Sequence, residues 1–354
     1  MSKKKKIIKK RYILRTILAS LGAVILLVGG FAMKHYYRLE ISNFESYNEE
    51  GHAYNIYPGT SIDEVLDMME ADYDIGSRQD VMLHARLLHF NYPEPGHYEF
   101  ESQLANRELI ERLKIGAQTP VHITWNNTIR TREQLAGQIA SKLMMDSVTL
   151  LEHLEDDEFL RPMGFNKETS RCLFIPNTYE VYWTITPEQL FARMQTEYKR
   201  FWTAERLEKA RKINLSPVEV AILASIVEEE SNLKRDQDTI ASLYLNRLRK
   251  GMLLQADPTV KYANGLFGAQ RVLTRHLKSE NPYNTYVYPG LPPGVLKCPN
   301  AQTIDKVLNA PKTPYIFMCA NPDFSGTHVF SVSHAEHQRV ANEYHQKLNE
   351  LKIK

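Results

Sequence analysis

The feature that most constrains this chain lies at its start, where basic residues precede an uncharged apolar segment. Thr16 to Met33 are eighteen residues without a charge, close to the ~20 residues that a membrane-spanning helix needs. Eight lysines and arginines stand within the first fifteen positions, which predicts a cytoplasmic N-terminus and an exported body. We therefore expect residues 1–15 to be a cytoplasmic basic tail and residues 16–36 to be a transmembrane anchor.

A cleaved signal peptide is the alternative interpretation of this start. The apolar segment is longer than a usual signal-peptide core, and residues 29–33 contain only a weak pattern of small residues for cleavage. The sequence favours an uncleaved anchor. The expected protein is therefore a single-pass protein of the inner (plasma) membrane with a periplasmic body.

The charge of the rest of the chain argues against a nucleic-acid binder. The chain has 44 lysines and arginines and 42 aspartates and glutamates. Without the eight basic residues of the first fifteen positions, 36 basic side chains remain against 42 acidic ones, a net charge of about −6. Nucleic-acid-binding domains present a basic surface instead. We expect no nucleic-acid partner.

Cysteines and histidines show no pattern that is typical of a metal site. Cys172, Cys298 and Cys319 include no close pair and allow at most one internal disulfide. We expect buried free thiols, with any pairing left open. His334 and His337 lack the spacing of the zinc-protease motifs. We expect no metal, and no lysine stands in a recognisable setting for an organic cofactor.

The exported body shows regions of different pattern. Residues 37–50 are polar and predict a stalk. Short strands, polar turns and amphipathic helices alternate between about 51 and 120, which predicts a small α+β module. From 121 the pattern is mostly helical, and residues 315–319 and 328–332 predict a β-hairpin before a closing helix from about 335. The expected fold class is α+β, with a transmembrane helix, a small α+β subdomain and a mixed, mostly helical domain over 121–354.

A helix with a clear start is expected from Pro217 to about residue 231. Ser216 precedes it as a cap, proline fits the first turn, and Glu219 stands at the capping-box position. The helix begins apolar and ends in three consecutive glutamates at 228–230. This combination makes the end of the helix a candidate site.

Helical spacing separates the three glutamates. Only Glu230 follows purely apolar side chains, Val227 and Ile226, at three and four residues. A carboxyl group on an apolar stripe loses hydration, which raises its pKa. A glutamate with a pKa raised toward ~6 can act as a general acid near neutral pH. The alternative, which spacing alone favours, is a helix end where the charges emerge into water.

Segments spread over the exported body match one family pattern in a fixed order. They are residues 174–179, 224–231, 246–262, 283–286 and 290–294, with His328, Glu336 and His337. Together they resemble the YceG-like (MltG) family of endolytic murein transglycosylases. The chain departs from the family pattern at Asn177, where aspartate is usual, and at Asn300, where glycine is usual.

The resemblance implies a lytic transglycosylase with Glu230 as its catalytic residue. Such an enzyme cleaves the MurNAc–GlcNAc bond of peptidoglycan while the muramyl 6-hydroxyl attacks its own anomeric carbon, which leaves a 1,6-anhydro-MurNAc end. Because the nucleophile belongs to the substrate, one carboxyl group suffices where glycoside hydrolases use two. Glu230 would protonate the leaving oxygen and then accept the proton of the 6-hydroxyl.

The resemblance also raises polar residues around these motifs to candidate substrate-binding residues. They are Ser231, Asn246, Gln255, Asp257, Thr259, Asn284 and Tyr286. Asp257 is the natural rival as a second carboxylate, although an aspartate in this setting more often caps a turn or a following helix. Asn246 and Arg247 are equally suited to holding their helix against its neighbour.

For the whole chain, the resemblance implies a LysM-like subdomain over 51–120 and a YceG-like catalytic domain over 121–354. The substrate would be nascent peptidoglycan glycan strands at the inner membrane, whose elongation the enzyme would terminate beside peptidoglycan synthases. One alternative is a non-catalytic glycan-binding scaffold of the cell-wall synthesis machinery. A cytosolic pyridoxal-phosphate lyase is a third interpretation, and it conflicts with the anchor.

Overall fold

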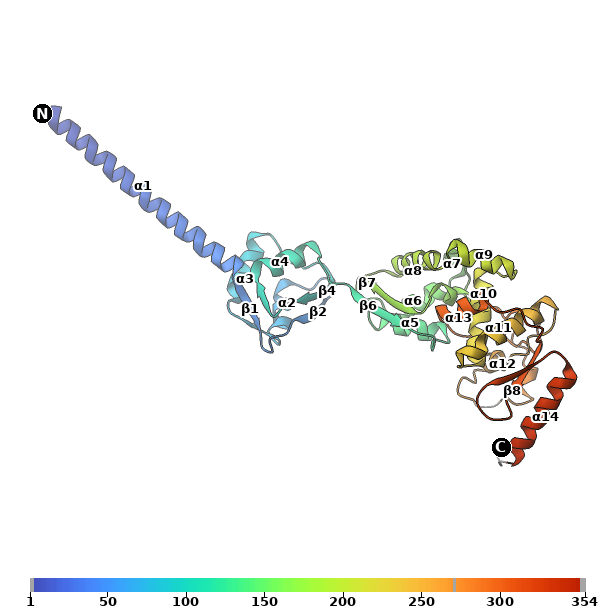
Figure 1. Ribbon diagram of the computed structural model, residues 1–354. Helices are drawn as coiled ribbons and strands as arrows, with labels where there is room; N and C mark the ends of the chain where they lie inside the picture. Colours follow the sequence, from blue (N-terminus) through green and yellow to red (C-terminus); the bar gives the residue numbers. More distant parts are fainter. Residues whose placement is uncertain (1–2, 270–271, 351–354) are drawn as a thin grey trace. The chain divides into compact units, whose positions relative to one another are not determined.

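The computed structural model describes residues 3–269 and 272–350 (Figure 1). The chain divides into two compact units. The first holds the residues up to Val121 together with Tyr182–Thr184, and the second holds His122–Val181 and the residues from Ile185 onward. Helices and small sheets occur in both units, which confirms the mixed α and β class.

The first unit begins with the long helix α1 (Lys3–Glu40). Its stretch Ile8–Glu40 is long and apolar enough to cross a membrane, and no residue in the most apolar window of that stretch is buried. The helix continues through the expected anchor and four residues into the expected stalk. Strand β1 (Ser42–Ser46) follows at once and buries Phe44 completely. The prediction of a polar stalk over 37–50 is therefore wrong, because an apolar side chain in that segment belongs to the core.

The rest of the first unit is built from short strands and helices around one apolar core. Strand β1 lies between β3 and β5, and β2 pairs with β4, all in antiparallel register. The core includes Phe44, Leu66, Tyr73, Tyr98 and Leu109. The remaining elements are β2 (His52–Ile56), α2 (Ile62–Met69), β3 (Tyr73–Ile75), α3 (Arg78–Leu87), β4 (Gly96–Phe100), β5 (Gln103–Ala105) and α4 (Asn106–Ile115).

The second unit is mostly helical, as expected. Strand β6 (Val121–Trp125) pairs with β7 (Asn177–Val181), and β8 (Phe317–Ala320) pairs antiparallel with β9 (His328–Ser331). The latter pair is the predicted hairpin. The helices of the second unit are α5 (Arg132–Ala140), α6 (Ser147–Glu155), α7 (Asp157–Leu160), α8 (Pro187–Phe201), α9 (Ala204–Lys212), α10 (Pro217–Glu230), α11 (Lys234–Arg249), α12 (Asp257–Ala263), α13 (Ala301–Leu308) and α14 (His334–Glu350). Short 3₁₀ turns lie at Arg161–Met163, Ser170–Leu173 and His276–Lys278.

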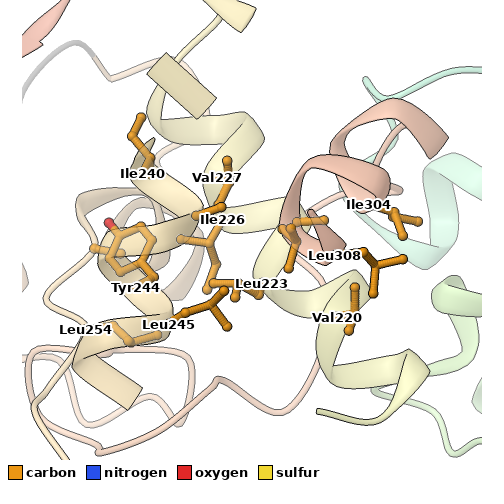
Figure 2. Close-up of a cluster of buried hydrophobic side chains, with 14 of the residues drawn as sticks. Val220, Leu223, Ile226, Val227, Ile240, Tyr244, Leu245, Leu254, Ile304 and Leu308 are labelled. Carbon is orange, nitrogen blue, oxygen red and sulfur yellow. The ribbon is translucent and has the colours of Figure 1, made fainter. Parts of the chain in front are cut away.

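Helix α10 forms the centre of the second unit. Its start is the predicted one: Ser216 Oγ accepts the backbone N–H of Glu219 at 3.2 Å, and the Glu219 carboxylate accepts the backbone N–H of Ser216 at 2.7 Å. Every residue from Val220 to Glu228 is buried. Figure 2 shows side chains of α10, α11 and α13 packed together in this core.

Removal of one buried hydroxyl group tests this packing. Ser225 is fully buried; its Oγ donates to Ile222 O at 2.7 Å and accepts the backbone N–H of Leu296 at 3.0 Å. Ser225→Ala leaves that buried N–H without a partner, so we expect the free energy of unfolding to fall by about 1–3 kcal/mol. Urea denaturation of the full chain in detergent measures the change.

A matched serine on the surface provides the control. Ser141 is exposed and donates only to Gln138 O, so Ser141→Ala is expected to change the free energy of unfolding by less than ~0.5 kcal/mol. Equal effects of the two substitutions would contradict the role given to Ser225.

Candidate functional site

A cavity of about 330 Å³ lies in the second unit, at the C-terminal end of α10. The other walls come from helix α11, the loop before α12, the start of α12, the loop that carries Tyr286, the hairpin β8–β9 and the start of α14. The lining residues are Glu230, Leu243, Tyr244, Arg247, Leu254, Gln255, Asp257, Tyr286, Met318, Cys319, Ala320, His328 and His337. Carboxyl, hydroxyl, guanidinium and imidazole groups therefore converge on one partly open cavity.

Glu230 is the last residue of α10, and its carboxyl group is enclosed by protein atoms although the residue as a whole is half-buried. Glu230 Oε1 accepts the hydroxyl of Tyr244 at 2.5 Å. Burial raises the pKa of Glu230 to about 7, and the negative charge of Asp257 acts in the same direction. The hydrogen bond from Tyr244 and the charges of Lys261 and Arg247 oppose this rise. Glu230 can therefore gain or lose a proton near neutral pH.

The three glutamates at the end of α10 differ in their partners. Glu228 is 5% exposed and accepts hydrogen bonds from the side-chain amides of Asn127 and Asn300. Glu229 pairs with Arg130 at 2.7 Å and with Lys297 at 2.9 Å. Amides and cations thus hold the first two as structural groups, whereas Glu230 faces the cavity.

The physical reason for preferring Glu230 is therefore not the one that helical spacing suggested. Because α10 is buried around its circumference, an apolar stripe does not separate one glutamate from the next. The alternative of charges emerging into water is wrong for Glu228, which is the most buried of the three. The cavity and the neutral partner Tyr244 distinguish Glu230 instead.

Asp257 and Tyr286 form a second polar pair in the cavity. Tyr286 donates its hydroxyl to Asp257 Oδ1 at 2.6 Å. Burial, followed by this carboxylate, raises the pKa of Tyr286, so its hydroxyl keeps the proton that it donates. Asp257 is the first residue of α12, and the capping position is Ala256, which makes no side-chain cap. The capping role that the sequence favoured for Asp257 is thus wrong.

Arg247 forms hydrogen bonds to several of the segments that make the wall of the cavity. Its guanidinium donates to Leu254 O at 2.7 Å and to Ile316 O at 2.6 Å, and it reaches Gln255 Oε1 at 3.3 Å. Gln255 has a φ of 51°, a left-handed conformation that is uncommon for glutamine. Arg247 therefore joins the loop before α12 to the hairpin, and burial lowers the pKa of its guanidinium.

The remaining expected binding residues lie beside the cavity and make internal hydrogen bonds. Ser231 Oγ accepts the backbone N–H of Leu233 at 3.1 Å. Asn246 donates to two backbone oxygens of the segment before β8, at 2.8 and 2.9 Å. Thr259 and Asn284 are fully buried and also donate to backbone oxygens. These side chains hold the walls in place, and they are not among the residues that line the cavity.

Sequence reasoning missed Tyr244 and did not place His328 or His337 at the site. Tyr244 stands one helical turn before Arg247, which was the available signal. The backbone N–H of His328 donates to Asp236 Oδ2 at 2.9 Å, and its Nδ1 lies 3.2 Å from the same oxygen. Within residues 3–269 and 272–350, no group of three or more metal-ligating side chains could hold a metal ion.

All three cysteines carry free thiols. Cys172 and Cys298 are buried, and burial raises the pKa of Cys298 to about 11. Cys319 is half-buried in the hairpin and lines the cavity.

The raised pKa of Glu230 predicts a pH-dependent stability. Between pH 4.5, the ordinary value, and about 7 the folded state holds a proton that the unfolded state has released, so stability falls as pH rises through this range. Glu230→Gln removes that dependence. Relative to the wild type, we expect the variant to gain about 3 kcal/mol between pH 4.5 and 8, measured by urea denaturation. A difference that stays constant with pH would contradict the buried carboxyl group.

Comparisons with known proteins show which family the chain is similar to. The model of the YceG-like family matches residues 54–343. An endolytic murein transglycosylase of Bacillus subtilis (strain 168) is 26% identical over 310 residues, which are 84% of this chain and 85% of that protein. An endolytic murein transglycosylase of Streptococcus pneumoniae serotype 2 (strain D39 / NCTC 7466) is 24% identical over 303 residues, which are 75% of this chain and 53% of that protein.

A solved structure extends the likeness to the fold. The crystal structure of a YceG-like protein from Listeria monocytogenes superposes with a TM-score of 0.54 at 25% identity, over 82% of this chain and 99% of that one. Since the family model also covers most of the sequence, the chain belongs to the YceG-like family.

Proposed function

We propose that this protein is an endolytic lytic transglycosylase that cleaves the MurNAc–GlcNAc bond of peptidoglycan glycan strands, with Glu230 as its acid and base. The observation that carries the proposal is an enclosed glutamate with a pKa of about 7 in a polar cavity. Two curated relatives that bear the name endolytic murein transglycosylase support the choice of substrate. A carboxyl group with this pKa is suited to proton transfer in both directions at neutral pH.

In the first step, protonated Glu230 gives its proton to the glycosidic oxygen and the leaving sugar departs. The carboxylate that results lies in the cavity and is stabilised by the hydroxyl of Tyr244. In the second step, this carboxylate takes the proton of the muramyl 6-hydroxyl while that oxygen attacks the anomeric carbon. Glu230 regains in the second step the proton that it gave in the first, so it ends the reaction protonated as it began. The product carries a 1,6-anhydro ring, and no water is consumed.

Asp257 has a different role in this proposal. The anomeric carbon gains positive charge as the bond breaks, and a carboxylate nearby stabilises that charge. Asp257 lines the same cavity and is oriented by the hydroxyl of Tyr286. It also keeps the pKa of Glu230 high before the reaction. One carboxyl group would thus transfer protons while the other supports the charge.

The site of action in the cell belongs to the same proposal. Helix α1 is long and apolar enough to anchor the protein in the plasma membrane, and the basic residues in its first thirteen positions favour a cytoplasmic N-terminus and a periplasmic body. Cleavage of nascent strands at the membrane surface would terminate their elongation, beside the peptidoglycan synthases that make them. We assign the first unit a LysM-like, glycan-binding role within this proposal.

Glu230→Gln tests the central role, because glutamine keeps the shape of the side chain and cannot transfer the proton. We expect loss of 1,6-anhydro products from uncrosslinked glycan strands by about 10²-fold or more, measured by mass spectrometry, while circular dichroism stays unchanged. Persistent 1,6-anhydro products would contradict the assignment of Glu230. A wild-type protein that binds the strands and releases no fragments would favour the alternative of a glycan-binding scaffold.

Two neighbours should move the pH profile in opposite directions. The activity should fall as pH rises through about 7, because Glu230 must begin protonated. Tyr244→Phe removes a hydrogen bond that lowers this pKa, so the alkaline limb of kcat/KM should move to higher pH. Asp257→Asn removes a charge that raises it, so the limb should move to lower pH. Movement of both limbs in the same direction would contradict the proposed electrostatics.

A further inference from the structure

His328 stands at the start of strand β9 and lines the cavity that holds Glu230, yet the proposed reaction gives it no role. Its Nδ1 lies 3.2 Å from Oδ2 of Asp236, and its backbone N–H donates to the same oxygen at 2.9 Å. Asp236 belongs to the first turn of α11 and does not line the cavity. The imidazole therefore touches a buried carboxylate outside the cavity and also forms part of the cavity wall.

Asp236 determines which ring nitrogen of His328 carries the hydrogen. The side chain of Asp236 is only 9% exposed, and its Oδ2 already accepts the backbone N–H of His328. A carboxylate accepts hydrogen bonds and donates none, so the ring nitrogen that faces it must be the donor. In the uncharged form of the ring, Nδ1 then carries the hydrogen and Nε2 carries a lone pair.

Nε2 of His328 is available to a ligand. Within residues 3–269 and 272–350 this atom makes no hydrogen bond, and it is not one of the unpartnered side-chain atoms that are buried. It is therefore open to solvent, although the side chain as a whole is only 16% exposed. The cavity is the space from which a ligand can reach it.

The hairpin that carries His328 is fixed to the helix that also bears the partner of Glu230. Asp236 holds β9 near the start of α11, and Arg247 near the end of α11 donates to the backbone just before β8 at 2.6 Å. Tyr244 lies between them on α11 and donates to Glu230. One helix therefore positions both the histidine and the glutamate, and a bound sugar needs such fixed geometry to react.

The cavity needs an acceptor for the donor groups of a sugar. Several of its other polar side chains are already paired: Tyr286 donates to Asp257, and Arg247 donates to carbonyl oxygens. Each peptidoglycan sugar carries an acetamido N–H, and most carry free hydroxyl groups. A donor of this kind costs free energy when it leaves water without finding a partner. Nε2 of His328 supplies such a partner.

We propose that Nε2 of His328 is a substrate-binding acceptor, which takes a hydrogen bond from a hydroxyl or acetamido N–H group of the glycan in the cavity beside Glu230. Asp236 is then a positioning residue, which acts through the ring and does not touch the sugar. This inference deepens the proposed function and rests on it.

Two substitutions of His328 separate contact with the substrate from support of the hairpin. Neither keeps the contact between Nδ1 and Asp236. His328→Phe keeps a flat ring without nitrogen, whereas His328→Gln places an amide oxygen close to the former position of Nε2. We expect KM for the release of 1,6-anhydro fragments from uncrosslinked glycan strands to rise about 3- to 10-fold in His328→Phe. In His328→Gln most of this rise should disappear, with kcat within about 2-fold of the wild type in both variants.

His122→Gln is the matched control, since His122 is exposed on β6 and does not line the cavity. Its KM should equal that of the wild type, and circular dichroism should show that all three variants fold. Equal rises of KM in His328→Phe and His328→Gln would reduce the ring to a support for the hairpin and overturn the substrate contact. An unchanged KM in His328→Phe would overturn it as well. A wild type that releases no 1,6-anhydro fragments would overturn the proposed function, and this inference with it.

Nitrogen NMR reads the same contact without removing the ring. The full chain in detergent carries isotope-labelled histidine, and the two ring signals of His328 are identified by their loss in His328→Gln. We expect the uncharged ring to hold its hydrogen on Nδ1. Addition of strands to the Glu230→Gln protein should then shift the Nε2 signal and leave the Nδ1 signal nearly unchanged. A hydrogen on Nε2 of the free protein, or an Nε2 signal that does not move with strands bound, would contradict the proposed acceptor.

Discussion

The site depends on one carboxyl group that is largely shielded from water at the end of a buried helix. Glu230 sits where α10 leaves the apolar core, and its immediate partner is a neutral hydroxyl from α11. A cation in that place would hold the group ionised, and open solvent would do the same. The neutral partner, at the wall of a partly open polar cavity, keeps both protonation states accessible.

The same helix shows how differently three adjacent carboxylates can be accommodated. Glu228 accepts hydrogen bonds from side-chain amides and Glu229 pairs with two cations, so both side chains link α10 to neighbouring segments. Burial without such partners costs free energy, and this cost falls on Glu230 alone of the three. A stable core around α10 is what allows the protein to keep that unfavourable group in place.

The sequence predicted local structure better than it predicted contacts between distant segments. The cap at Ser216, the hairpin before residue 335 and the strand–turn–helix pattern of the first unit follow from turn chemistry and periodicity over a few residues. The prediction of a polar stalk over residues 37–50 failed because the burial of Phe44 depends on its pairing with Ile75 and Leu104, which are distant in the sequence. The partner of Glu230 was also hidden, since Tyr244 meets it from a second helix and only its position one turn before Arg247 marks it.

The candidate binding residues divide for the same reason into those that face the cavity and those that position them. Thr259 Oγ1 meets Thr285 Oγ1 at 2.8 Å, and Asn284 Oδ1 accepts the backbone N–H of Tyr286 at 3.0 Å. These buried contacts orient the loop that brings Tyr286 onto Asp257. A motif residue can therefore be essential to the site without touching a ligand, because a fully buried hydrogen bond sets the position of a neighbour that does. The polar residues of these motifs are distinguished from the cavity partners of Glu230 only by the direction in which the fold turns each side chain.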